Sequence, residues 1–185
     1  MNLDLLVILC AGNFTNYKKY TDFLDSGVYI GAKTRMESGI PLVSKAKKVL
    51  LIGGSKRKVL AMKRYYQENL KPTPDNLVCI VSGPSTYGNI YALNKYIETY
   101  VKKLSHIGIL TSCFHFTRMY SFVFKVFSDY SQRYSNIIPI CSEIILESDS
   151  LSDPRFYNMV NLESNGVIDL KKNTYRKRSG RFEII

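Results

Sequence analysis

A chain of 185 residues has the size of one globular domain and is long enough to bury a hydrophobic core. Its hydrophobic fraction of 45% and charged fraction of 22% are ordinary for such a domain, which excludes disorder of the whole chain. The formal net charge of +11 favours an anionic partner, which would be a phosphorylated small molecule, nucleic acid or an anionic membrane surface, although a merely solubilising surface is the alternative.

Five short apolar runs predict buried β-strands, because runs of Val, Ile and Leu without alternation are typical of strands covered on both faces. In chain order the runs are Leu3–Ala11, Lys48–Ile52, Leu77–Val81, Ile107–Leu110 and Asn136–Ile140. Apolar residues at i, i+3, i+4 spacing predict helices over Lys56–Asn69, Gly88–Leu104 and Phe116–Tyr130. The alternation of the two predicts an α/β fold, a Rossmann-like three-layer sandwich with a mainly parallel sheet of five or more strands.

The chain changes in composition after Ile140. The stretch SEIILESDSLSDPRFYNMVNLES is more acidic and predicts a helix that begins near Ser152, with Asp153 and Pro154 in its first turn. The terminal KKNTYRKRSGRFEII is strongly basic. It is either a flexible arm that contacts phosphate or a frayed end of the chain. We therefore expect an α/β domain over residues 1–150, a helical extension over 151–170 and a basic tail over 171–185.

The cysteines and the N-terminus predict a reducing, cytoplasmic environment. The four cysteines are Cys10, Cys79, Cys113 and Cys141. None forms a Cys-x-x-Cys pair, and no second cluster completes a tetrahedral site with Cys113 and His115, so we expect reduced thiols and no structural metal. The first apolar run carries Asp4 and lacks a basic leader, and no run reaches the roughly 18–20 apolar residues that span a bilayer.

Small or hydroxylated residues follow each of the first four predicted strands. Parallel strands end at one edge of their sheet, and this carboxyl edge is where open α/β proteins bind ligands. Glycine permits close backbone approach, and helix N-termini with Ser or Thr hydroxyls supply donors for an anion, although tight turns alone also favour small residues. The junction residues predicted to contact a substrate are Gly12, Asn13, Gly53, Gly54, Ser55, Ser85, Thr86, Thr111 and Ser112.

One of the chain's two histidines lies in the segment TSCFHFTR, directly after the fourth predicted strand. His115 falls near the start of the next helix, and Arg118, three residues on, shares its helical face. Histidine changes its charge near neutral pH, and arginine binds phosphate or carboxylate at two points. We predict that His115 and Arg118 are catalytic, whereas a capping or surface histidine is the alternative. His106 precedes its strand, at the opposite edge.

Several motifs occur in an order that is shared with a known family. They are VILCAGN, AKTRME with Arg35, VLLIGGS, STYGNIYA with Thr86 and Asn89, and TSCFHFTR. From about Leu3 to Ile140 the chain resembles the YdcF/SanA/ElyC-type family of bacterial domains, and the last two motifs are the most specific. The resemblance implies a modified Rossmann-type fold of the cytosolic branch, S-adenosylmethionine as a possible cofactor, and Arg35 and Asn89 as further ligand contacts.

The chain departs from the family pattern at two positions. Relatives usually have an acidic residue after the glycine pair, where this chain has Lys56, Arg57 and Lys58, and often a glutamate at the position of Gly88. The loss of two acidic side chains favours a ligand more anionic than S-adenosylmethionine, which carries a sulfonium charge.

Three functions are compatible with the sequence. The first is an enzyme, a hydrolase or transferase, that acts on a phosphorylated or nucleotide-like small molecule, with His115 as acid or base and Arg118 and Arg35 as anion clamps. The second is a module that binds or senses a nucleotide or S-adenosylmethionine without chemistry. The third is a nucleic-acid binder, which the pI near 9.5 allows, but no nucleic-acid motif occurs. We expect the first, with an anionic small molecule as partner and not nucleic acid.

The sequence contains no Walker motif, G-x-S-x-G elbow or carboxylate pair that would specify the reaction. The sequence also does not indicate an oligomeric state.

Overall fold

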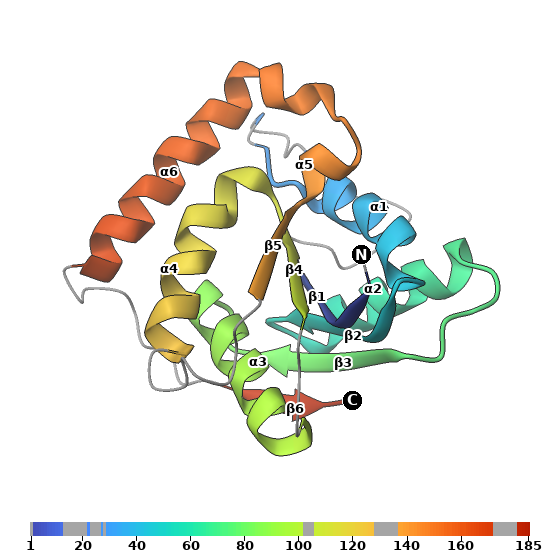
Figure 1. Ribbon diagram of the computed structural model, residues 1–185. Coiled ribbons are helices and arrows are strands. Elements are labelled where there is room, and N and C mark those ends of the chain that lie inside the picture. Colours follow the sequence, from blue (N-terminus) through green and yellow to red (C-terminus); the bar gives the residue numbers. More distant parts are fainter. Residues whose placement is uncertain are drawn as a thin grey trace.

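The computed structural model describes residues 2–12, 22, 27, 29–101, 106–127, 137–171 and 181–185, and for Ser150 and residues 165–171 only the backbone. A six-stranded sheet forms its centre (Figure 1). The strands are β1 (Leu3–Leu9), β2 (Ala46–Gly53), β3 (Leu77–Ser82), β4 (Ile107–Thr111), β5 (Ile137–Cys141) and β6 (Phe182–Ile184). Their order is β5-β4-β1-β2-β3-β6, and only β6, which pairs with β3, is antiparallel to its neighbour. The predicted α/β fold with a mainly parallel sheet is therefore confirmed.

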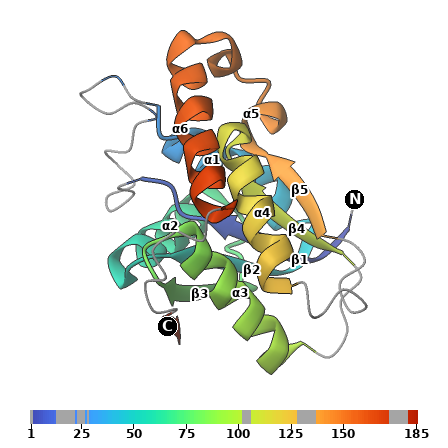
Figure 2. The same cartoon turned by 90° about the vertical axis from the view of Figure 1, so that its left-hand side faces the viewer.

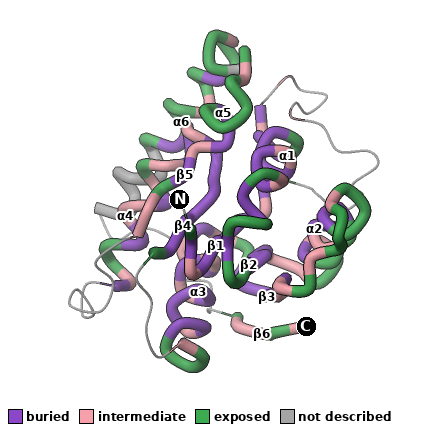
Figure 3. The backbone as a smooth tube through the Cα atoms, turned by 45° about the vertical axis from the view of Figure 1, so that its right-hand side comes forward, coloured by how far each residue is buried: buried purple, intermediate pink, exposed green. Residues whose placement is uncertain are grey.

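Helices cover both faces of the sheet (Figure 1). They are α1 (Ala32–Val43), α2 (Lys56–Asn69), α3 (Thr86–Tyr100), α4 (Phe116–Phe127), α5 (Ser142–Ile145) and α6 (Pro154–Lys171), with 3₁₀ turns η2 (Cys113–His115) and η4 (Asp149–Ser152). On one face, Leu6 and Ile8 of β1 pack with α1 and α2. On the other face, Leu5, Val7 and Leu9 pack with α3 and α4. This two-sided burial, visible at the centre of Figure 3, explains why β1 has no polar alternation.

Serine residues at two strand–helix junctions start the helices beside the sheet edge. Ser55 caps α2, where its Oγ accepts from the backbone N–H of Lys58 at 3.4 Å. Ser85 caps α3, where its Oγ accepts from the backbone N–H of Gly88 at 3.0 Å. These bonds satisfy donors that the helix itself leaves open. As a result α3 begins at Thr86, two residues before the start that apolar spacing predicts.

The strand order reverses beside β1. The chain runs from β1 through β2 to β3 on one side of β1, and then crosses to place β4 and β5 on the other side. The carboxyl ends of β1 and β4 therefore flank the point at which the strand order reverses, and the helices that follow them, α1 and α4, pack on opposite faces of the sheet. This is the position at which doubly wound proteins bind their ligands.

The C-terminal part of the chain joins the same body. Helix α6 lies beside α4 (Figure 2) and packs on η2. Phe156 of α6 forms an aromatic cluster with Tyr29 and Phe114. The end of the predicted basic tail is strand β6, which extends the sheet next to β3, while residues 172–180 of that tail lie outside the described residues. No helix in the described ranges is both long and apolar enough to cross a membrane.

Candidate functional site

A cavity of about 660 Å³ opens at the carboxyl edge of the sheet, and we call it the edge cavity. The predicted site residues that line it are Gly12, Arg35, Gly54, Ser55, Ser85, Thr86, Asn89, His115 and Arg118. Three others do not line it, namely Gly53, Thr111 and Ser112. Asn13 lies outside the described residues. The junctions of β1, β2 and β3 thus meet at one cavity with the segment after β4.

Arg35 connects the ends of two strands beneath the edge cavity. Its Nη1 donates to the carbonyl oxygen of Leu9 at 3.0 Å, and its Nη2 donates to Ser112 Oγ at 2.8 Å. The side chain is buried, and burial lowers the pKa of its guanidinium while the charge of Glu143 opposes that shift. Nε has no hydrogen-bond partner in the part of the chain that the structure describes. Ser112 therefore holds the guanidinium of Arg35 in place and does not itself line the cavity.

Gly31 makes the contact between Arg35 and Ser112 possible. It is the N-cap residue of α1 and has a φ of 61°, in the left-handed region that favours glycine. A Cβ at this position would lie 2.2 Å from Ser112 Oγ. Only glycine therefore allows the start of α1 to lie so close to the Ser112 hydroxyl.

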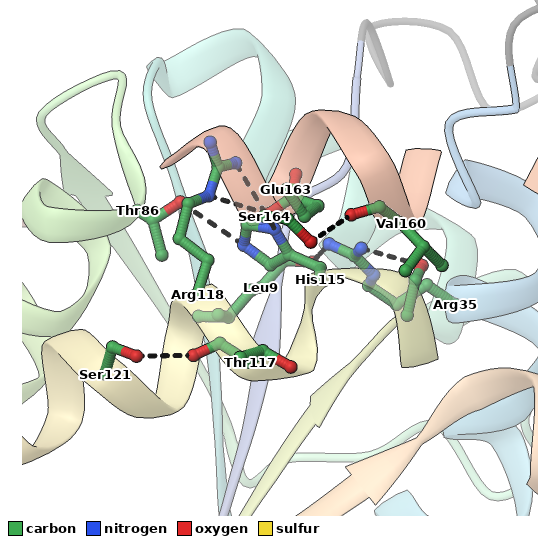
Figure 4. A network of polar contacts seen from close by, with 11 residues as sticks. Leu9, Arg35, Thr86, His115, Thr117, Arg118, Ser121, Val160, Glu163 and Ser164 are labelled. Atoms are coloured by element: carbon green, nitrogen blue, oxygen red, sulfur yellow. Dashed lines mark hydrogen bonds and ion pairs between the residues drawn. The ribbon is translucent and has the colours of Figure 1, made fainter. Parts of the chain in front are cut away.

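His115 lies between a carboxylate and a hydroxyl group (Figure 4). Its Nδ1 is 3.0 Å from Glu163 Oε2 and its Nε2 is 3.3 Å from Thr86 Oγ1. An ionised Glu163 accepts from Nδ1–H, which leaves Nε2 to accept from the Thr86 hydroxyl. Burial lowers the pKa of His115, while the hydrogen bond and charge of Glu163 oppose this. The imidazole is thus a buried base with a defined tautomer.

Arg118 shares the carboxylate of Glu163 with His115. Its Nε is 2.7 Å from Glu163 Oε2, an ion pair in which the N–H is not aligned as a hydrogen bond. Its Nη2 lies 3.3 Å from His115 Nδ1, which is a close contact and no hydrogen bond once Nδ1 carries a proton. The Arg118 side chain is 32% exposed. The guanidinium therefore keeps an accessible edge for an anion.

Glu163 is the main residue that the sequence did not point to. Its side chain is only 8% exposed and comes from α6, outside the range of the family resemblance. The available signal was its spacing from Phe156 and Met159, which places the three on one helical face. Phe156 is buried and Met159 also lines the cavity. An acidic residue on such an apolar face indicates a buried partner.

Positive charge predominates around the edge cavity. Its lining includes three cations, Arg35, Lys58 and Arg118, and one acidic residue, Glu163. Lys58 Nζ donates to the carbonyl oxygen of Gly12 at 2.6 Å. Helices α2 and α3 begin at the cavity without an acidic residue in their first turn, so their N-termini add positive potential. These features favour an anionic ligand.

The thiol that lines the cavity is neutral. Burial raises the pKa of Cys10 to about 11, although the charges of Lys58 and Arg35 act in the other direction. Since the thiolate is the nucleophilic form, Cys10 supplies no nucleophile near neutral pH. No group of three or more His, Cys, Asp or Glu side chains within the described ranges is arranged to hold a metal ion.

Comparison with family models, curated proteins and solved structures found no match to this chain. The chemistry that the described residues offer is that of a buried histidine, its carboxylate partner, an adjacent hydroxyl and a cationic cavity.

Proposed function

We propose that the protein is an enzyme, a hydrolase or transferase, that acts on a phosphorylated or nucleotide-like small molecule bound in the edge cavity. The observation that carries this proposal is the contact of His115 with Glu163 on one nitrogen and with a hydroxyl of the cavity wall on the other. A histidine held in this way is a general acid or base, and such groups typically contribute about 10²–10⁴-fold to a rate.

The charges around the cavity favour a phosphorylated ligand. The accessible edge of Arg118 is a donor for phosphoryl oxygens, and Arg35, which also lines the cavity, adds a buried positive charge. The N-termini of α2 and α3 add backbone donors and positive potential. A cationic ligand such as S-adenosylmethionine suits the site less, because the one acidic residue of the lining already pairs with Arg118.

The size of the cavity and the family resemblance support the same proposal. A volume of about 660 Å³ lies within the range of about 300–1,000 Å³ that is common for small-molecule sites. Thr86, Asn89, His115 and Arg118, which carry the resemblance to the YdcF/SanA/ElyC-type family, all line the cavity. Two residues of each of the two most specific motifs therefore face one cavity, while Thr111 and Ser112 of the second motif are buried outside it.

The proposal is tested by a thermal-shift panel of nucleotides, sugar nucleotides, S-adenosylmethionine and polyprenyl phosphates. The proteins compared are wild type, Arg118→Ala and the control Arg64→Ala, whose arginine is exposed on α2. A ligand at about 100 times its Kd stabilises the fold by about 2.7 kcal/mol, or roughly 5–10 °C for a chain of this size. We expect a phosphorylated ligand to shift wild type and the control but not Arg118→Ala. The absence of a shift with every compound would contradict the proposal.

A further inference from the structure

We infer that Thr86 is the nucleophile of this site. Its hydroxyl, activated by the Glu163–His115 pair, attacks the phosphorus of the bound substrate and forms a transient phosphothreonine. The inference rests on the proposed function, to which it adds covalent catalysis on a phosphoryl group.

Glu163, His115 and Thr86 form a continuous chain of polar contacts. Glu163 Oε2 lies 3.0 Å from His115 Nδ1, and His115 Nε2 lies 3.3 Å from Thr86 Oγ1. A carboxylate that orients an imidazole, which in turn accepts a hydroxyl proton, is the arrangement that activates hydroxyl nucleophiles in unrelated folds. A somewhat long distance between hydroxyl and imidazole is common before substrate binds.

Thr86 occupies a position that favours attack on a phosphoryl group. It is the first residue of α3, directly beyond the Ser85 cap, and it lines the edge cavity. A phosphoryl group beside its Oγ1 therefore lies at a helix N-terminus, where negative charge is stabilised. Arg118 also lines the cavity and lies against the same histidine, so its guanidinium is placed to bind the charge that develops during transfer.

The other hydroxyl and thiol groups of the cavity lining are less suited to act as the nucleophile. Ser55 Oγ and Ser85 Oγ accept from backbone N–H groups and cap their helices, whereas the hydroxyl hydrogen-bonded to the imidazole is that of Thr86. The Cys10 thiol is neutral. Among the described side chains that line the cavity, Thr86 is the one hydroxyl in contact with an imidazole.

The two chemical steps balance. In the first, a bond forms between Thr86 Oγ1 and phosphorus while the bond from phosphorus to the leaving oxygen breaks. The hydroxyl proton passes to His115 Nε2 and then to the leaving oxygen. In the second, water or an acceptor alcohol gives its proton to Nε2 and its oxygen attacks phosphorus, so that the bond to Oγ1 breaks and Oγ1 regains a proton from Nε2. Water gives hydrolysis and an alcohol gives transfer.

A fluorophosphonate ester tests this chemistry without a known substrate. Attack by Thr86 Oγ1 forms an oxygen–phosphorus bond and expels fluoride, while the hydroxyl proton leaves through His115. Intact-protein mass and peptide mapping locate the adduct. We expect labelling of Thr86 in wild type, labelling of the new hydroxyl in Thr86→Ser, none at this position in Thr86→Val, and labelling that is slower by about 10²-fold or more in His115→Gln. An unlabelled Thr86 in wild type, or a rate that His115→Gln leaves unchanged, would overturn the inference.

Matched variants separate this inference from the proposed function. Thr86→Val keeps the side-chain shape without the hydroxyl, and Thr99→Val is the control because Thr99 lies on the same helix with its Oγ1 bonded to Lys95 O. With the ligand found by thermal shift, Thr86→Val should keep the shift and lose turnover by about 10²-fold or more, while Thr99→Val keeps both. Turnover that persists in Thr86→Val but disappears in His115→Gln would remove Thr86 as nucleophile and leave the proposed function standing.

Discussion

Glu163 Oε2, on the C-terminal helix α6, lies 3.0 Å from His115 Nδ1, on the turn that follows β4. The two residues are 48 positions apart in the chain. Residues 151–170, which composition alone marks as an extension, therefore contribute a side chain to the candidate site.

The substitution Glu163→Gln should lower turnover by about 10²–10⁴-fold, because the amide neither favours the charged imidazole nor fixes its Nδ1 proton as a carboxylate does. The carboxylate also opposes the lowering of the His115 pKa that burial causes. Its removal should therefore move the acid limb of the profile of kcat/KM against pH to lower pH. Steady-state rates across pH measure both effects.

The control for this variant is Glu98→Gln on α3. Glu98 pairs with Lys95 in a partly exposed ion pair, which is worth about 0–1 kcal/mol. The variant Glu98→Gln should leave kcat/KM and the pH profile unchanged. A Glu163→Gln enzyme with the wild-type acid limb would contradict the assigned role of the carboxylate.

Stability should fall in mildly acidic solution because of His115. Burial lowers its folded pKa below the ordinary value of 6.5, so between these two values the unfolded chain holds a proton that the folded chain does not. The stability that the neutral form of His115 contributes is complete above pH 6.5 and is lost as the pH falls through the folded pKa. The free energy of unfolding then changes by at most about 1.4 kcal/mol per pH unit.

Urea unfolding of wild type and His115→Gln at several pH values between 7.5 and 5 measures this slope. The variant should lose less stability than wild type over that interval. His106→Gln is the control, since His106 is exposed, and it should keep the wild-type slope. Equal slopes in wild type and His115→Gln would show that His115 has no lowered pKa.

The substitution Gly31→Ala should destabilise the protein more than Gly27→Ala. Both glycines have positive φ values, of 61° and 75°, so both variants strain the backbone by about 1–3 kcal/mol. A Cβ at Gly31 would also lie 2.2 Å from Ser112 Oγ, whereas among the described residues the nearest atom to a Cβ at Gly27 is 3.9 Å away. Urea midpoints compare the two variants, and equal losses would contradict the tight contact between α1 and Ser112.

The substitution Arg35→Lys should destabilise the protein. An ammonium group cannot donate to Leu9 O and Ser112 Oγ from two fixed nitrogens as the guanidinium does, and each hydrogen bond to a charged group is worth about 1.5–3 kcal/mol. Urea unfolding should therefore show a loss in that range or above. The exposed control Arg64→Lys should change stability by about 0.5 kcal/mol or less. A urea midpoint of Arg35→Lys equal to that of wild type would contradict the role of these two hydrogen bonds in holding the ends of β1 and β4 together.

Most of the fold can be predicted from the sequence, because the spacing of apolar residues within each segment distinguishes strands from helices. The first five strands overlap the predicted runs rich in Val, Ile and Leu, and α2 occupies the predicted range Lys56–Asn69. Strand β6 was not predicted, because Phe182–Ile184 is too short to have a pattern of its own and depends on pairing with β3. Junction chemistry likewise brings Thr86, His115 and Arg118 to one cavity.

What local pattern does not reveal is which polar groups bind a ligand and which support those that do. Thr111 and Ser112 follow β4 as the junction argument requires, yet both are fully buried, and Ser112 bonds to Arg35. Glu163 reaches His115 only because α6 packs on η2. Both relationships depend on contacts between distant segments, which spacing along the chain does not encode.

The central claim is that His115 is the acid or base of an enzyme. The most direct test uses phosphorus NMR to measure turnover of the ligand found by thermal shift, with wild type and with His115→Gln. We expect wild type to convert the phosphorylated compound, and the variant to show the thermal shift but to convert the compound at least about 10²-fold more slowly. Binding by both proteins without conversion by either would contradict catalysis and indicate a module that binds its ligand without chemistry.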